Sequence, residues 1–137
     1  MVVDVANAID LSWESEDIPD TDVLYMRVHW RQLDEDGVLI PGAFKDIGGG
    51  MSTDWDKYSN PDQTRARAAD PTANAVIAMS VGEVRTVPGQ IVIHTPSLEF
   101  NNRAHTDVIG EKKKNPEVRL KFTRIYRVVI PYAGQHT

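Results

Sequence analysis

Residues 23–33 place the strongest constraint on the fold, because apolar and polar side chains alternate along most of this segment. A period of two is typical of a β-strand that has one buried face and one polar face. The turn sequence Asp34-Glu35-Asp36-Gly37 follows, and residues 38–40 are again apolar until Pro41 interrupts them. The pattern predicts a β-hairpin, and therefore an antiparallel sheet, near the start of the domain.

Three other segments bear on the sheet. Residues 75–81 form a continuous apolar run, which predicts a strand buried on both faces. Residues 84–87 and 91–94 flank the turn pair Pro88-Gly89 and predict a second hairpin. Residues 45–58 have no clear period, so we expect irregular structure there, with the three glycines at 48–50 as a flexible hinge.

Two helices are predicted from their start signals. Asn60-Pro61 and Asn115-Pro116 each place a capping residue before a proline at the first helical position. The first helix is expected over 60–69, and the second over 116–130, where one stripe is apolar: Val118, Phe122, Ile125, Tyr126 and Val129. The expected fold is α+β, a mainly antiparallel sheet of two hairpins plus a buried strand, with two short helices packed on one face.

The length of 137 residues is that of one domain. We expect an acidic N-terminal arm or edge segment over 1–20 and a single α+β domain over 21–137. The chain has no cysteine, which excludes disulfides, thiolate zinc sites and a cysteine nucleophile. It shows neither a signal-peptide pattern nor an apolar run long enough to span a membrane, so a soluble, cytoplasmic protein is expected.

Charge is distributed unevenly along the chain. Residues 1–22 contain seven acidic and no basic residues, whereas residues 111–127 contain seven basic and two acidic ones. In both segments the charged side chains fit a surface role, in which they simply face water. Alternatively, the acidic segment lies on the basic one, or either contacts a charged partner. Nucleic acid is not an expected partner, because the net charge is −5 and the basic segment lacks interleaved aromatic residues on its basic face.

The segment 94–107 is the leading candidate site, because it follows an apolar strand and is rich in polar side chains. His94, His105 and Asn102 are its candidate catalytic residues, with the two imidazoles as acid and base toward a phosphodiester. The two imidazoles could instead bind a divalent metal with Asp107 or Asp54 as a third ligand. The spacing fits no strict metal motif, so no metal or other cofactor is expected. A purely structural loop is the remaining alternative.

The polar face of the first predicted strand is the second candidate site. Tyr25 shares this face with three potentially cationic side chains, which suit binding of phosphate or carboxylate. The 94–107 loop adds a further guanidinium. The candidate ligand-binding residues are therefore Arg27, His29, Arg31 and Arg103. A solvated outer sheet face would show the same pattern.

Common motifs of other chemistries are missing from the sequence. The glycines at 48–50 are not followed by the Gly-Lys-Ser/Thr of a phosphate-binding loop. Ser52, Ser59, Ser80 and Ser97 lie in no recognisable hydrolase motif. Residues 51–59, together with His94-Thr95-Pro96 and Asn102-Arg103-Ala104-His105, resemble the motif blocks of a bacterial protein family. The resemblance implies no particular activity, and no catalytic residue is carried over from it.

Three function classes follow, in this order of preference. The first is a small bacterial-type binding or interaction module, acting as an accessory to a protein partner or binding a phosphate-bearing small molecule. The second is a small histidine-dependent enzyme that acts on a nucleotide or phosphate-bearing substrate through the His94–His105 loop. The third is a metal-binding domain that uses His94 and His105. The sequence does not indicate an oligomeric state.

Overall fold

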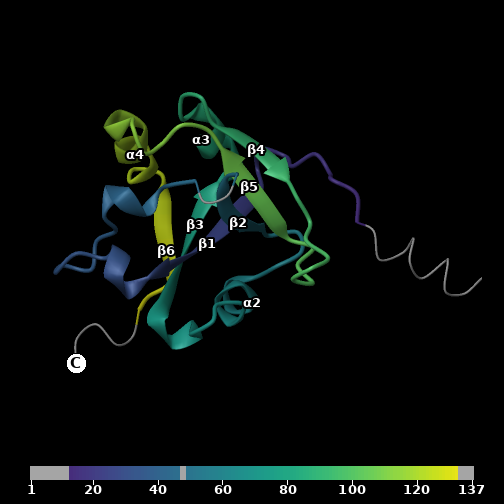
Figure 1. Ribbon diagram of the computed structural model, residues 1–137, viewed down its shortest axis with the longest axis horizontal. Coiled ribbons are helices and arrows are strands. Elements are labelled where there is room, and N and C mark those ends of the chain that lie inside the picture. Colours follow the sequence, from purple (N-terminus) through teal and green to yellow (C-terminus); the bar gives the residue numbers. More distant parts are fainter. Residues whose placement is uncertain (1–12, 47–48, 133–137) are drawn as a thin grey trace, which may run out of the picture.

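A computed structural model describes residues 13–46 and 49–132 of the chain (Figure 1). Its centre is a six-stranded antiparallel sheet with the strand order β4-β5-β2-β1-β3-β6. The strands are β1 (Val23–His29), β2 (Met51–Trp55), β3 (Asn74–Ser80), β4 (Ile91–His94), β5 (His105–Ile109) and β6 (Tyr126–Ile130). The helices are α2 (Pro61–Ala66), α3 (Val81–Thr86) and α4 (Pro116–Phe122). The predicted α+β class with a mainly antiparallel sheet is confirmed.

The hydrophobic core lies on one face of this sheet. Leu24, Met26 and Val28 of β1 are buried in it, as the alternation of that strand predicts. Phe44, from the segment before β2, stacks on Phe122 of α4 with ring centroids 5.0 Å apart. The helices α3 and α4 both contribute buried side chains to the core, so they cover this face.

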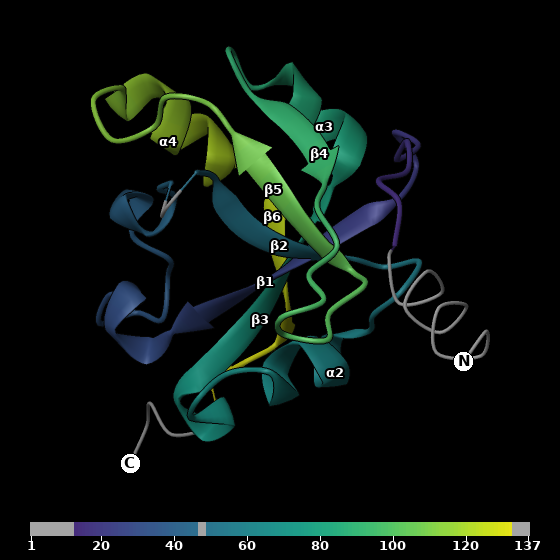
Figure 2. The ribbon, with the colours of Figure 1, turned by 45° about the vertical axis from the view of Figure 1, so that its right-hand side comes forward.

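Helix α2 covers part of the opposite face (Figure 2). Its buried Thr64 donates a hydrogen bond to Asp54 of β2, and Asp54 is paired with Tyr25, on the face opposite Leu24. The two predicted helices therefore lie on opposite faces of the sheet, rather than on one. The reason is that the two helices are held by different contacts. Polar contacts hold α2, whose sequence has no apolar stripe, whereas apolar packing holds α4.

Several elements form where the sequence predicts them. β3 is buried along its centre and lies between β1 and β6. The side chain of Asn60 caps α2 by accepting a hydrogen bond from the backbone N–H of Gln63. Asn115 caps α4 in the same way through Val118. Each of these elements is specified by residues within or next to it, such as the asparagine at the start of each helix.

The first predicted hairpin is reduced to a single pair, Leu33 with Leu39. After β1 the chain forms a 3-10 turn over Trp30–Gln32, capped by the side chain of His29. Strand β1 instead pairs along its whole length with β3 and, over two residue pairs, with β2. The capping interaction of His29 with Gln32 competes with strand extension and ends the strand.

The second predicted hairpin is wrong in its first half. Residues 81–86 form helix α3, whose N-cap is Ser80 and whose third residue is Glu83. The sequence Ser-x-x-Glu is the known signature of a helix start, so this signal was present but masked by the apolar run before it. Only β4 forms as a strand, and its partner is β5, which begins inside the predicted 94–107 loop and ends beyond it.

The helix predicted over 116–130 ends at Phe122, and residues 126–130 form β6. Thr123 caps the helix with its backbone N–H, and β6 then pairs with β3. An unpaired β3 edge would leave backbone groups of a buried strand without partners. Pairing with β6, which is rich in β-branched residues, satisfies these backbone groups. The hydrogen bonds gained by this long-range pairing stabilise residues 126–130 more than continuation of the apolar helix would.

Strand β2 forms within the segment 45–58, so the irregular structure expected there is wrong for residues 51–55. It begins beside Gly50, where a Cβ atom would lie 2.9 Å from the Cβ of Asp107 on β5. This close approach requires glycine at position 50, so the position serves strand packing rather than a hinge. Gly48 lies outside the described residues.

The expected N-terminal arm lies partly outside the described residues, which begin at Trp13. Within residues 13–22, Ile18 is buried in the core. The acidic side chains Glu16 and Asp20 form ion pairs with Lys57 and Arg85, rather than with residues 111–127. In the part of the chain that the structure describes, no helix is long and apolar enough to cross a membrane.

Candidate functional site

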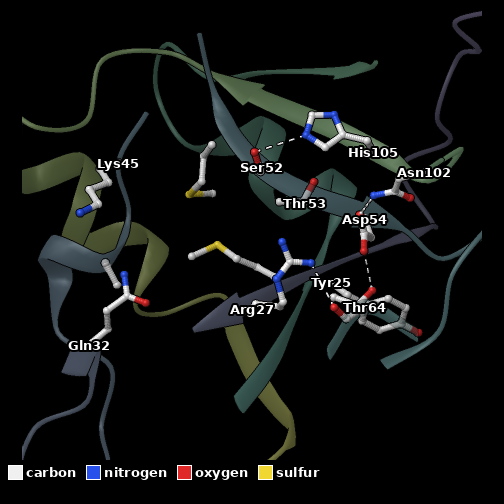
Figure 3. A pocket seen from close by; sticks show the side chains of 13 residues that line it. Tyr25, Arg27, Gln32, Lys45, Ser52, Thr53, Asp54, Thr64, Asn102 and His105 are labelled. Carbon is white, nitrogen blue, oxygen red and sulfur yellow. Dashed lines mark hydrogen bonds between the residues drawn. The ribbon is translucent and has the colours of Figure 1, made fainter. Parts of the chain in front are cut away.

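A pocket opens where strands β1 and β2 separate (Figure 3). The two strands pair only at Leu24 with Trp55 and at Tyr25 with Asp54. Beyond these pairs they diverge, and a cavity of about 230 Å³ remains between them. Polar residues of its lining come from β1, the 3-10 turn after it, the segment before β2, β2 itself, helix α2 and the 97–105 segment: Arg27, Gln32, Lys45, Ser52, Thr53, Asp54, Thr64, Asn102 and His105.

The guanidinium of Arg27 lies in the middle of this pocket, between the two strands (Figure 3). Its Nη1 donates a hydrogen bond of 3.0 Å to the backbone carbonyl of Thr64 in α2. A guanidinium has five N–H donors, and within residues 13–46 and 49–132 the Arg27 side chain makes this one hydrogen bond while lining the pocket. Arg27 is therefore a fixed positive charge with unused hydrogen-bonding capacity.

Asp54 lies beside Arg27, but its charge is already compensated. Its side chain is only 4% exposed and forms an ion pair of 2.8 Å with Arg67. It also accepts hydrogen bonds of 2.8 Å each from the Thr64 hydroxyl and the Asn102 amide. Such donors offset the cost of burying a carboxylate away from water. The network joins β2, α2 and the 97–105 segment into one wall of the pocket.

A second hollow of about 420 Å³ adjoins the pocket. The two share Arg27, Ser52, Asn102 and His105 in their linings, so they form one continuous depression. Phe100 lines the outer part, and this residue is 75% exposed. The depression thus combines a cationic centre with an exposed aromatic ring at its rim.

His105 faces this depression from β5 and contacts Ser52 of β2. The Nε2 atom of His105 lies 3.3 Å from the Ser52 hydroxyl oxygen. On the other side of the ring, Nδ1 lies 3.0 Å from the backbone carbonyl oxygen of Thr95. A carbonyl only accepts hydrogen bonds, so Nδ1 carries the proton of the neutral ring and Nε2 accepts from Ser52.

His94 lies on the opposite face of the sheet from His105. It pairs with Thr106, the neighbour of His105 on β5, and successive strand residues face opposite sides. Its side chain is buried against Trp55 and Tyr58. Nδ1 accepts from the backbone N–H of Glu16 at 3.0 Å, and Nε2 donates to the carbonyl of Arg103 at 2.7 Å.

The two histidines therefore do not converge, contrary to the acid–base pair proposed from the sequence and to the alternative of a metal site shared by the two imidazoles. The physical reason is the register of β4 with β5: the chain folds back and pairs His94 with Thr106, so the neighbouring His105 faces the other side of the sheet. His94 holds the 13–18 segment and Arg103 against the sheet. Among residues 13–46 and 49–132, no three or more side chains of the metal-binding types cluster to hold an ion.

The candidate ligand-binding residues are also separated by the fold. Arg27 lines the pocket, but His29 caps the 3-10 turn after β1 and accepts from the backbone N–H of Arg31 at 3.1 Å. Arg31 is exposed beside Trp30, with its guanidinium carbon 5.4 Å from the ring centroid. Arg103 lies over Tyr58 on the His94 side, with the corresponding distance 4.4 Å. Of the predicted residues, Arg27, Asn102 and His105 meet in the pocket.

Sequence reasoning missed the central position of Asp54 and the contact between Ser52 and His105. Asp54 was identified only as an alternative metal ligand, because residues 45–58 show no clear period that would place it on a face of the sheet. The Ser52–His105 contact follows from the register between β2 and β5, in which Ser52 faces Asp107 and Asp54 faces His105. Such a diagonal neighbour on one sheet face is set by long-range pairing, which no local signal contains.

Glu16 gives the N-terminal segment a pH-dependent contact. Hydrogen bonds from Lys57 and then Tyr58 hold the pKa of Glu16 below its ordinary value. A carboxyl with a lowered folded-state pKa stabilises the fold above its unfolded-state pKa and loses this contribution as pH falls through the folded-state pKa. We expect wild type to be more stable than Glu16→Gln at pH 6, and the difference to disappear below that lowered pKa. Thermal unfolding of both proteins from pH 6 to pH 2.5 measures it, and a constant difference would contradict the assignment.

Comparisons with known proteins give no match: no protein-family model, no curated protein and no solved structure is significantly similar to this chain.

Proposed function

We propose that the protein is a binding module whose pocket between β1 and β2 takes a small molecule with a phosphate or carboxylate group. The observation that carries this proposal is which charged side chains in the pocket already have an ion-pair partner. Arg27 lines the cavity and is held by one hydrogen bond from its guanidinium to Thr64, while the carboxylate of Asp54 is already paired with Arg67. An incoming anion would therefore meet a guanidinium that forms no ion pair with a carboxylate of the described residues.

Neighbouring groups support the same ligand chemistry. Lys45 lies at one end of the pocket and adds a second positive charge, and the hydroxyl of Ser52 and the amide of Gln32 offer hydrogen bonds. Arginine binds phosphate and carboxylate with two parallel N–H donors, which gives orientation as well as attraction. A binding site usually combines a few such polar groups with a concave surface.

The exposed ring of Phe100 supports a ligand with a planar or apolar part beyond its anionic group. Phe100 lines the outer hollow, which shares Arg27 with the inner pocket. A ligand held by Arg27 could extend across the hollow and stack on this ring. A nucleoside monophosphate has this combination of groups and is a suitable probe, whereas inorganic phosphate tests the inner pocket alone.

The test is a titration of the protein with inorganic phosphate and with adenosine monophosphate, followed by thermal shift and by calorimetry. We expect both to stabilise wild type, because a ligand that binds only the folded state raises its apparent stability. Arg27→Ala should weaken both by at least about 10-fold, the effect of losing roughly 1.4 kcal/mol of binding. Phe100→Ala should weaken only the nucleotide.

Arg31→Ala is the matched control, because Arg31 is an exposed arginine in the turn directly after β1 and does not line the pocket. Its binding should equal that of wild type. An equal loss of affinity in Arg27→Ala and Arg31→Ala would indicate that only the net charge of the protein matters. Unchanged binding in Arg27→Ala would place the anion elsewhere and refute the proposal.

A further inference from the structure

The contact between Ser52 and His105 has the geometry of a nucleophile and its base. The hydroxyl oxygen of Ser52 lies 3.3 Å from Nε2 of His105. Nucleophile–base pairs are found at about 2.6–3.2 Å, and often somewhat longer without substrate. Ser52 is exposed and lines both parts of the depression, so its hydroxyl is accessible to a bound molecule.

The other side of the imidazole is held in the orientation that a general base needs. Nδ1 of His105 lies 3.0 Å from the carbonyl oxygen of Thr95 and 2.9 Å from its hydroxyl oxygen. The Thr95 hydroxyl in turn donates to the carboxylate of Asp107 at 3.0 Å. Because the carbonyl fixes the proton on Nδ1, Nε2 keeps its lone pair directed at Ser52. Thr95 and Asp107 are thus positioning residues, comparable in role to the third member of a catalytic triad.

We infer that Ser52 and His105 form a catalytic pair for acyl transfer from a carboxylic ester whose alcohol part carries an anionic group. The inference rests on the proposed function in one respect, since Arg27 would hold that anionic group. Ser52 differs from the serines of known hydrolase motifs in lying on a strand, so the assignment depends on this geometry alone.

The reaction follows from the positions of these groups. The Ser52 oxygen forms a bond to the ester carbonyl carbon while Nε2 of His105 takes the hydroxyl proton. The C–O bond to the alcohol then breaks, and the leaving oxygen takes that proton from Nε2. Water, deprotonated by the same nitrogen, attacks the acyl-serine, and the released Ser52 oxygen recovers the proton. The products are a carboxylic acid and an alcohol, and no oxidant, reductant or further reactant is needed.

A fluorophosphonate probe tests the pair without requiring the natural substrate. The Ser52 oxygen would bond to phosphorus, fluoride would leave, and the hydroxyl proton would pass to His105. We expect peptide mass spectrometry to find the label on Ser52. His105→Gln should lower the labelling rate by at least about 100-fold, the usual contribution of a general base. Thr95→Val should lower it less and change its pH dependence, which a merely structural role would not do.

Ser80→Ala is the matched control, because Ser80 caps α3 and lines neither part of the depression, so Ser52 labelling in this variant should equal that of wild type. Circular dichroism of each variant confirms that it is folded. Three results would overturn the inference: no label on Ser52, equal labelling of His105→Gln, or a label distributed over other serines. Phosphate binding is measured separately, so phosphate binding without labelling would refute the catalytic pair and leave the binding pocket standing.

Discussion

Asp54→Ala is expected to lower the free energy of unfolding by about 3 kcal/mol, because removing one partner of a buried ion pair leaves the other without compensation. Three donors lose their acceptor at once, those of Arg67, Thr64 and Asn102. For a domain of this size, the change corresponds to a decrease of roughly 10 °C in the melting temperature. Chemical denaturation and calorimetry measure both quantities.

Two further variants separate the possible causes. Asp54→Asn keeps one acceptor oxygen but removes the charge, so its stability should lie between those of Asp54→Ala and wild type. Asp62→Ala is the control, because Asp62 is an exposed acid in the first turn of α2 and should change stability by less than about 1 kcal/mol. If Asp54→Ala were no more destabilising than this control, the network would not support the pocket wall.

Lys112→Met is expected to lower the free energy of unfolding by about 2–3 kcal/mol, since buried acceptors without donors are costly. The Lys112 side chain is 0% exposed and its ammonium donates to Asp46 and to the carbonyls of Val108 and Gly110. Burial lowers the pKa of Lys112, and the hydrogen bond to Asp46 opposes this shift. The three contacts link the end of β5 to Asp46, the residue that follows Lys45 of the pocket lining.

Lys113→Met is the matched control for this prediction. It removes the same charge from the next, exposed position, and should leave stability within about 0.5 kcal/mol of wild type. Urea unfolding of the two variants compares them directly. Equal stability would show that the buried ammonium contributes nothing net, as happens for some buried ion pairs that hydrophobic residues can replace.

The fold was predictable from sequence where local chemistry decides it. The alternation of β1, the apolar run of β3 and the asparagine caps of α2 and α4 all identify elements that form. The prediction failed where pairing between distant segments decides. Residues 126–130 carry a helical stripe, yet they form a strand because β3 needs a partner on its open edge.

The candidate site was predictable in its residue types but not in its assembly. Arg27, Asn102 and His105 were identified and meet in the pocket, whereas His94 was identified and lies on the other face. The difference arises from the register between β4 and β5, which pairs His94 with Thr106 and so places His94 on the face opposite His105. A sequence pattern gives the period of a strand, but not its starting point or its partner.

The central claim, that the pocket between β1 and β2 binds anions through Arg27, is tested most directly by mapping bound phosphate onto backbone amide resonances. Protein labelled with ¹⁵N is titrated with inorganic phosphate at constant pH and ionic strength. We predict saturable shifts for residues 25–27, 51–54 and 102–105, all lost in Arg27→Ala. A second basic hollow provides the contrast, lined in part by Lys113, Lys114 and Arg119. Shifts confined to residues 111–119 and retained in Arg27→Ala would contradict the claim.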